Sequence, residues 1–203
     1  MSHKCFISFK KEDKYYRDEI LKKLGQEDVL VKFLDRWIDS EDADYILQEI
    51  RDNYLSDTTV TLFLIGLHSK EDEGVDRFGR DNNFFIKREL QASLFDGKGN
   101  TRSGIVGVVL PEMESRVFTG NYQCSVCGKT HFSAIVDDST VVREFSCNYF
   151  SPPKPGCCWG ESDRYCVLTT YAQFIADPDQ YVNCAYDKRY SRIAEKIRLR
   201  NLR

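Results

Sequence analysis

A glutamate in an amphipathic segment is the first residue in this sequence whose type and position could do chemistry. Apolar residues recur at helical spacing within residues 83–95, and Glu89 lies on the shoulder of this stripe, one turn after Phe85. Partial burial beside an aromatic ring raises the pKa of a carboxyl group and directs it into a pocket. Glu89 is therefore a candidate functional carboxyl, and its shoulder position predicts little contribution to stability. The alternative is a solvated side chain that pairs with Lys87 or Arg88.

The cysteines form the second candidate site. Seven of the eight lie after residue 120. Cys124 and Cys127, followed by Gly128, have the spacing of a knuckle that presents two thiolates to one tetrahedral Zn²⁺ ion. The residues that could supply further ligands are His131, Cys147, Cys157, Cys158 and Cys166. We expect such an ion to be structural, because no open position with a general base is evident; buried or surface thiols without metal are the alternative.

Length and composition limit the classes of protein. The 203 residues suffice for one substantial domain, and 41% hydrophobic with 30% charged residues exclude collagen, bulk disorder and a membrane protein. A net charge of −3 disfavours binding to nucleic acid or to an anionic membrane. Lys10 and Lys11 interrupt the first apolar stretch, which is unlike a secretory signal, so we expect a cytoplasmic protein with reduced cysteines.

Short apolar runs alternate with amphipathic stretches through the first 110 residues. Strands are expected at residues 5–9, 29–34, 59–65 and 105–110, and helices at residues 13–24, 46–54 and 83–95. Strands that are apolar on both faces and separated by helices are typical of a parallel sheet covered on both sides. We therefore predict a flavodoxin-like, doubly wound α/β fold that binds ligands beyond the carboxyl ends of its strands.

The second half of the chain loses this pattern. We expect three parts: an α/β core at residues 1–110, a Cys- and Pro-rich insertion on the sheet edge at residues 111–165, and a C-terminal part at residues 166–203 that completes the same domain. In the last part, residues 166–168 are a candidate strand, helical turns are expected near residues 171–174, and a final helix is expected near residues 190–197.

Four segments carry a resemblance to a known family. They are Lys4–Phe9, Leu34–Trp37, Ser56–Gly66 and Phe85–Leu90. In this order and spacing, they resemble a TIR-like domain of the bacterial branch found in the Thoeris antiphage defence system, over about residues 3–110. Enzymatic TIR domains carry an aromatic residue, usually Trp, four residues before a catalytic glutamate. Phe85 and Glu89 match those two positions, with Phe in place of Trp.

The resemblance implies cleavage of the nicotinamide–ribose bond of NAD. Nicotinamide leaves from an oxocarbenium-like centre, and a carboxylate such as Glu89 can hold the ribose hydroxyls and stabilise the positive charge. Residues near the ends of the first two strands, together with the aromatic residue before Glu89, would contact the substrate. They are Phe6, Ser8, Phe9, Asp35, Arg36, Trp37 and Phe85.

The resemblance also implies a pathway. After a phage-derived trigger, the ADP-ribosyl part would be hydrolysed or cyclised into a signalling nucleotide. A separate effector protein would sense this product. Whether the chain associates with itself is left open by the resemblance. A non-catalytic TIR-type interaction module and a nucleoside deoxyribosyltransferase-like enzyme are the alternatives. A phospho-receiver domain is disfavoured, because the chain after residues 59–65 lacks an acceptor aspartate.

Overall fold

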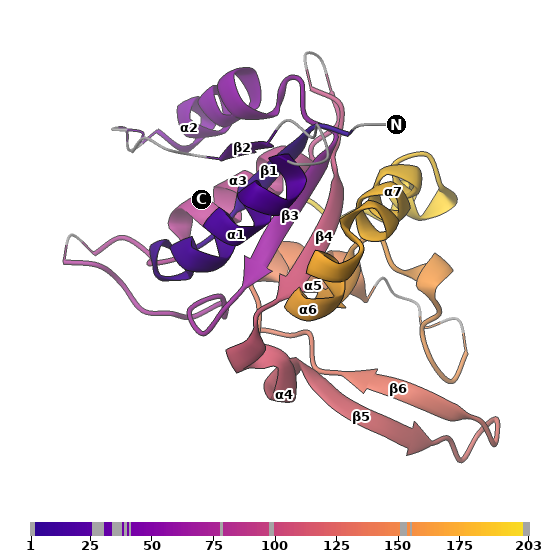
Figure 1. Cartoon of the computed structure of the whole chain (residues 1–203). Helices are drawn as coiled ribbons and strands as arrows, with labels where there is room; N and C mark the ends of the chain where they lie inside the picture. The colour runs from indigo at the N-terminus through magenta and orange to yellow at the C-terminus, as the bar shows by residue number, and fades with distance from the viewer. Residues whose placement is uncertain are drawn as a thin grey trace.

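A five-stranded parallel sheet forms the centre of the molecule (Figure 1). The structure is a computed structural model that describes residues 3–25, 31–33, 38, 40, 42–77, 79–97, 100–150, 154 and 156–200. The strands are β1 (Cys5–Ser8), β2 (Val31–Phe33), β3 (Val60–Ile65), β4 (Gly104–Val109) and β7 (Val167–Thr170). Their order, β2-β1-β3-β4-β7, is the flavodoxin-like order, which confirms the predicted fold class.

Helices cover both faces of this sheet. On one face lie α1 (Lys14–Gly25), α6 (Tyr171–Ala176) and α7 (Pro178–Lys188). On the other lie α2 (Ala43–Ile50), α3 (Phe84–Leu94) and α5 (Arg143–Tyr149). Asp42 caps α2 by accepting hydrogen bonds from two backbone N–H groups of its first turn. Within the described residues, every helix is too short or too polar to cross a lipid bilayer.

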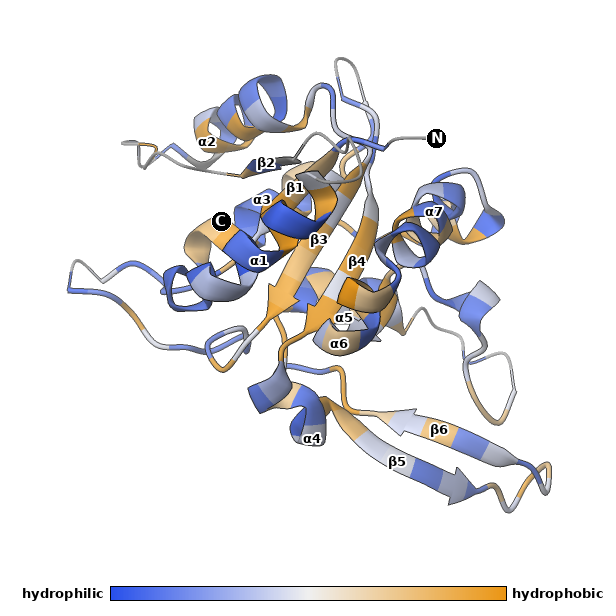
Figure 2. Ribbon diagram, viewed as in Figure 1, coloured by the Kyte–Doolittle hydropathy of each residue, from blue (hydrophilic) through white to orange (hydrophobic). Residues whose placement is uncertain are grey.

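The strands are apolar because both of their faces are buried. Figure 2 shows β3 and β4 as mostly hydrophobic, and all their residues are buried. Side chains alternate along β1: Cys5 and Ile7 join the cluster under α1 and α7, whereas Phe6 joins the cluster under α2. This alternation places Ser8 on the same face as Phe6, and therefore toward α3.

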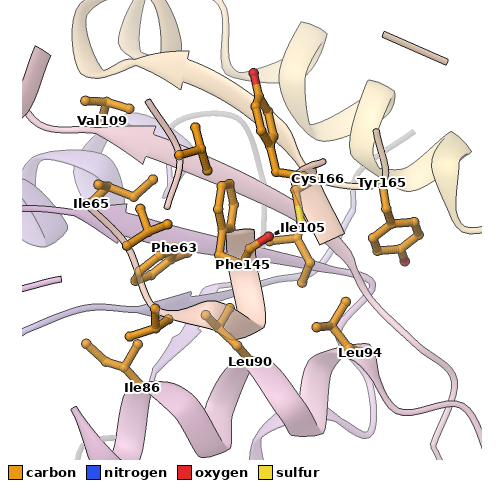
Figure 3. Close-up of a cluster of buried hydrophobic side chains, with 14 of the residues drawn as sticks. Phe63, Ile65, Ile86, Leu90, Leu94, Ile105, Val109, Phe145, Tyr165 and Cys166 are labelled. Atoms are coloured by element: carbon orange, nitrogen blue, oxygen red, sulfur yellow. Dashed lines mark hydrogen bonds between the residues drawn. The ribbon is translucent and has the colours of Figure 1, made fainter. Parts of the chain in front are cut away.

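The core on the α3 side is drawn in Figure 3. Leu90 of α3 and Phe63 of β3 pack there with Phe145 of α5. The ring of Phe145 lies so close to β4 that a Cβ atom at Gly107 would be 2.5 Å from it. Glycine at this position therefore permits the close contact between α5 and the sheet.

The structure corrects several sequence predictions in the second half. The insertion does not lie only on the sheet edge, since α5 packs on the sheet face. The insertion also contains α4 (Glu114–Val117) and an antiparallel hairpin of β5 (Phe118–Gln123) and β6 (Thr130–Ala134). The expected last helix is a 3₁₀ turn, Arg192–Lys196, and α7 was not predicted as a separate helix.

Candidate functional site

Glu89 and Ser8 form a buried polar pair between α3 and the end of β1. Ser8 is the last residue of β1, and its Oγ donates a 2.6 Å hydrogen bond to Glu89 Oε2. Ser8 is fully buried, and Glu89 is only 5% exposed. The pair lies at the carboxyl end of β1, next to the point where the strand order reverses between β1 and β3. Doubly wound folds bind their ligands at such a point.

Burial sets the charge of this carboxyl group. Removal from water raises the pKa of Glu89 to about 8, and the hydrogen bond from Ser8 opposes the increase because it stabilises the charged form. Glu89 is therefore mainly protonated at neutral pH in the ligand-free protein. A cation placed beside it would lower its pKa and favour the carboxylate. The Glu89 carboxyl group can therefore interact favourably with a ligand that carries a positive charge.

The burial of Glu89 is greater than the helical pattern predicted. The sequence placed it on a partly buried shoulder, but every residue of α3 from 86 to 94 is buried. α2 and α5 both pack against α3, and the C-terminal segment reaches it through a hydrogen bond from Gln91 to the backbone of Arg200. Lys87, which the sequence offered as a partner for Glu89, forms ion pairs with Asp81 and Glu71 instead.

The predicted aromatic residues lie in different environments. Phe6 is fully buried in the cluster under α2, and Phe85 packs against that cluster from α3. Phe9 is partly buried on the α1 side, where the guanidinium of Arg17 lies 4.8 Å from its ring centre. The structure therefore brings Phe6, Ser8 and Phe85 to one side of the sheet and Phe9 to the other. Their contacts with a substrate stay predictions.

The substrate-binding segment predicted after the second strand lies outside the described residues. It consists of Asp35, Arg36 and Trp37, which follow β2 in the chain. Their role in substrate binding stays a prediction.

A second buried carboxyl group was missed by the sequence analysis. Asp13 lies after β1, and burial together with the negative charge of Glu112 raises its pKa to about 6. Its carboxylate fills the space beside Gly66, where a Cβ atom would lie 2.5 Å from either oxygen. Because Gly66 follows β3, this group belongs to the carboxyl edge of the sheet. Its place at the start of the helix that follows the first strand was the signal in the sequence.

Four potential metal ligands converge at the hairpin. Sulfur or nitrogen atoms of Cys124, Cys127, His131 and Cys157 all lie within 4.8 Å of one another, so this group could hold a metal ion. The backbone N–H groups of Cys127 and Val126 lower the pKa of the Cys124 thiol to about 6. The predicted pair, Cys124 and Cys127, therefore lies together with His131 and Cys157, two of the further candidate ligands. Cys166 is not part of the group; it is buried beside α5.

The strand order and the layers of helices define a flavodoxin-like α/β protein, with a Cys/His cluster added in its second half. Residues 6–77 match the family model described as Thoeris protein ThsB, TIR-like domain. The resemblance drawn from the sequence motifs is thereby confirmed over this stretch, which covers β1 from its second residue, β2 and β3, and ends before α3. Comparisons with curated proteins and with solved structures gave no significant match.

Proposed function

We propose that this protein cleaves the nicotinamide–ribose bond of NAD and converts the ADP-ribosyl part into a signalling nucleotide, in cyclic form, during antiphage defence. The observation that carries the proposal is the buried hydrogen bond between Ser8 and Glu89 at the carboxyl end of β1. It supports the proposal because it holds an acidic group at the ligand-binding edge of a chain whose first part matches a TIR-like domain.

Glu89 would act by electrostatic stabilisation. As nicotinamide leaves with the electrons of the glycosidic bond, positive charge develops on the ribose, and a carboxylate held beside it lowers the energy of that state. The raised pKa of Glu89 matters here, since the approach of the cationic substrate favours loss of its proton. Ser8 keeps the carboxyl group in one orientation, so little reorganisation is needed during the reaction. A hydroxyl of the ADP-ribosyl part, or water, then takes the place of nicotinamide.

A signalling role in antiphage defence requires a trigger upstream of this protein and a sensor of its product downstream. In the proposed scheme, a phage-derived component triggers the reaction in the cytoplasm, and a separate effector protein senses the nucleotide product. Self-association of the chain is compatible with this scheme, and the scheme does not require it.

Metabolite profiling of phage-infected cells, with and without this protein, tests the proposal. Cells that carry the protein should lose NAD, release nicotinamide and gain an ADP-ribose-derived nucleotide after infection. Phage protection with unchanged NAD would contradict the proposal and would favour a non-catalytic interaction module. Release of a free base from deoxynucleosides instead of from NAD would favour a deoxyribosyltransferase.

A further inference from the structure

The β5–β6 hairpin extends away from the main sheet (Figure 1). Five of the six residues of β5 are exposed, and β6 has no buried residue. An isolated two-stranded hairpin is only marginally stable in water, because it buries too little apolar surface. Phe118 and Ala134 pack the base of the hairpin against the core, so a further interaction would add most stability at its outer end.

The turn of the hairpin has the form of a metal knuckle. The backbone N–H of Gly128 donates to the carbonyl of Cys124, and the N–H of Cys124 donates to the carbonyl of Lys129. Gly128 has a φ of +69°, which favours glycine and allows the chain to turn back at this point. The turn directs the sulfur atoms of Cys124 and Cys127 toward the same place.

The other two ligand atoms arrive from β6 and from a distant loop. His131 Nε2 lies 3.0 Å from the sulfur of Cys127 and 3.4 Å from the sulfur of Cys157. With bonds of about 2.3 Å to sulfur and about 2.0–2.1 Å to nitrogen, tetrahedral Zn²⁺ separates a sulfur from a nitrogen by about 3.6 Å. The spacings are therefore close to those of ligands that share one ion.

We propose that the chain binds one structural Zn²⁺ ion in a closed site with three thiolates and one imidazole. The ligands are Cys124 Sγ, Cys127 Sγ, His131 Nε2 and Cys157 Sγ. Sulfur and imidazole nitrogen select zinc over magnesium or calcium, which prefer oxygen. Four protein ligands fill the tetrahedron and leave no position for water or substrate, so the ion has no catalytic role.

The ion would tie the hairpin to the body of the molecule. Cys157 comes 26 residues after His131, and the chain between them contains α5, whose residue Phe145 is part of the core. The loop beyond Cys157 is held to the same body, because the ring of Trp159 packs on Phe150, 5.0 Å between centres. Zinc therefore crosslinks an exposed hairpin to a segment fixed by the core. This inference is independent of the proposed NAD chemistry.

The adjacent cysteines Cys157 and Cys158 give a matched pair of variants for the test. The full chain is purified without chelator from cells supplied with zinc, and its metal content is measured by mass spectrometry. We expect near-stoichiometric zinc in the wild type and in Cys158→Ser, and loss of most of the zinc in Cys157→Ser. Wild-type protein with little zinc, or an equal loss in the two variants, would overturn the proposal.

A second measurement uses the wild-type chain alone, so it does not depend on how the variants fold. Zinc is removed with a chelator and Co²⁺ is added; the site should then show the intense thiolate-to-cobalt absorption of a tetrahedral thiolate complex. Hydrogen exchange should show fast exchange of β5 and β6 amides in the metal-free chain, with β3 and β4 still protected. Absence of the cobalt band, or unchanged exchange in the hairpin, would overturn the proposal.

Discussion

Replacement of Glu89 by Gln should make the stability of the protein less sensitive to pH. Glu89→Gln keeps the shape of the side chain and an oxygen that accepts the hydrogen bond from Ser8, but it cannot ionise. The pKa of Glu89 is about 8 in the folded protein and 4.5 for an unperturbed group. Between these two values the unfolded chain loses the proton and the folded protein keeps it. Stability of the wild type must therefore fall as pH rises through this window.

The size of the effect follows from the pKa difference. One pKa unit corresponds to about 1.4 kcal/mol, so ionisation of Glu89 destabilises the fold by at most about 5 kcal/mol at a pH above 8. From about pH 5.5 to about pH 7.5, the wild type should lose about 2.5 kcal/mol relative to Glu89→Gln. This result corrects the small contribution that the shoulder position predicted, because the structure buries the carboxyl group. The new amide N–H group adds a cost of about 1–3 kcal/mol that does not vary with pH.

Urea unfolding at a series of pH values measures this difference. The free energy of unfolding is determined for both proteins, and the difference between them is plotted against pH. Asp13 and Glu144, two other carboxyl groups with a raised pKa, are present in both proteins, so their contributions cancel. A difference that stays constant across the window would show that Glu89 is not a buried group with a raised pKa, and would refute the reasoning.

Two further predictions concern the same fold. Ser8→Ala removes the hydrogen bond that lowers the pKa of Glu89, so the rise of kcat/KM with pH should move to higher pH, with about a tenfold or greater loss at neutral pH. Ser93→Ala removes a different buried hydroxyl, which lies on α3 and contacts Thr61, and should leave the pH profile of kcat/KM unchanged. A shift of the profile in both variants, or in neither, would contradict the role of Ser8. Gly104→Ala places a Cβ atom against the backbone of α7, so urea unfolding should show a loss of about 1–3 kcal/mol or more. Gly25→Ala meets no atom within 4 Å and serves as the control; equal stability of these two variants would show that α7 does not pack so closely on β4.

Local patterns in the sequence were enough to predict the central sheet and its first helices. The apolar runs of β3 and β4 are buried on both faces, so they stand out without knowledge of any contact. The hairpin was missed because its strands are exposed and carry no hydrophobic alternation that could reveal them. The start of α7 does have a sequence signal, since the capping residue Asp177 is followed by Pro178. The sequence analysis did not separate this helix from the helical turns expected near residues 171–174.

The candidate sites were predictable only in part, since they depend on contacts between distant residues. Ser8 lies two residues after Phe6 along β1, and in the structure both side chains lie on the α3 side of the sheet. The depth at which Glu89 is buried depends on α5 and the C-terminal segment, which no helical pattern within α3 can reveal. Likewise, Cys124 and Cys127 have a recognisable spacing, but the choice of Cys157 over its neighbour requires the fold of the intervening chain.

Turnover of NAD by Glu89→Gln tests the central claim most directly. NAD loss and nicotinamide release are measured in lysate of phage-infected cells for wild type, for Glu89→Gln, and for Glu195→Gln, which makes the same change at an exposed site. The account predicts normal turnover by Glu195→Gln and a loss of about 10²–10³ in rate for Glu89→Gln, the usual cost of one preorganised electrostatic contact. Equal turnover by wild type and folded Glu89→Gln would contradict it.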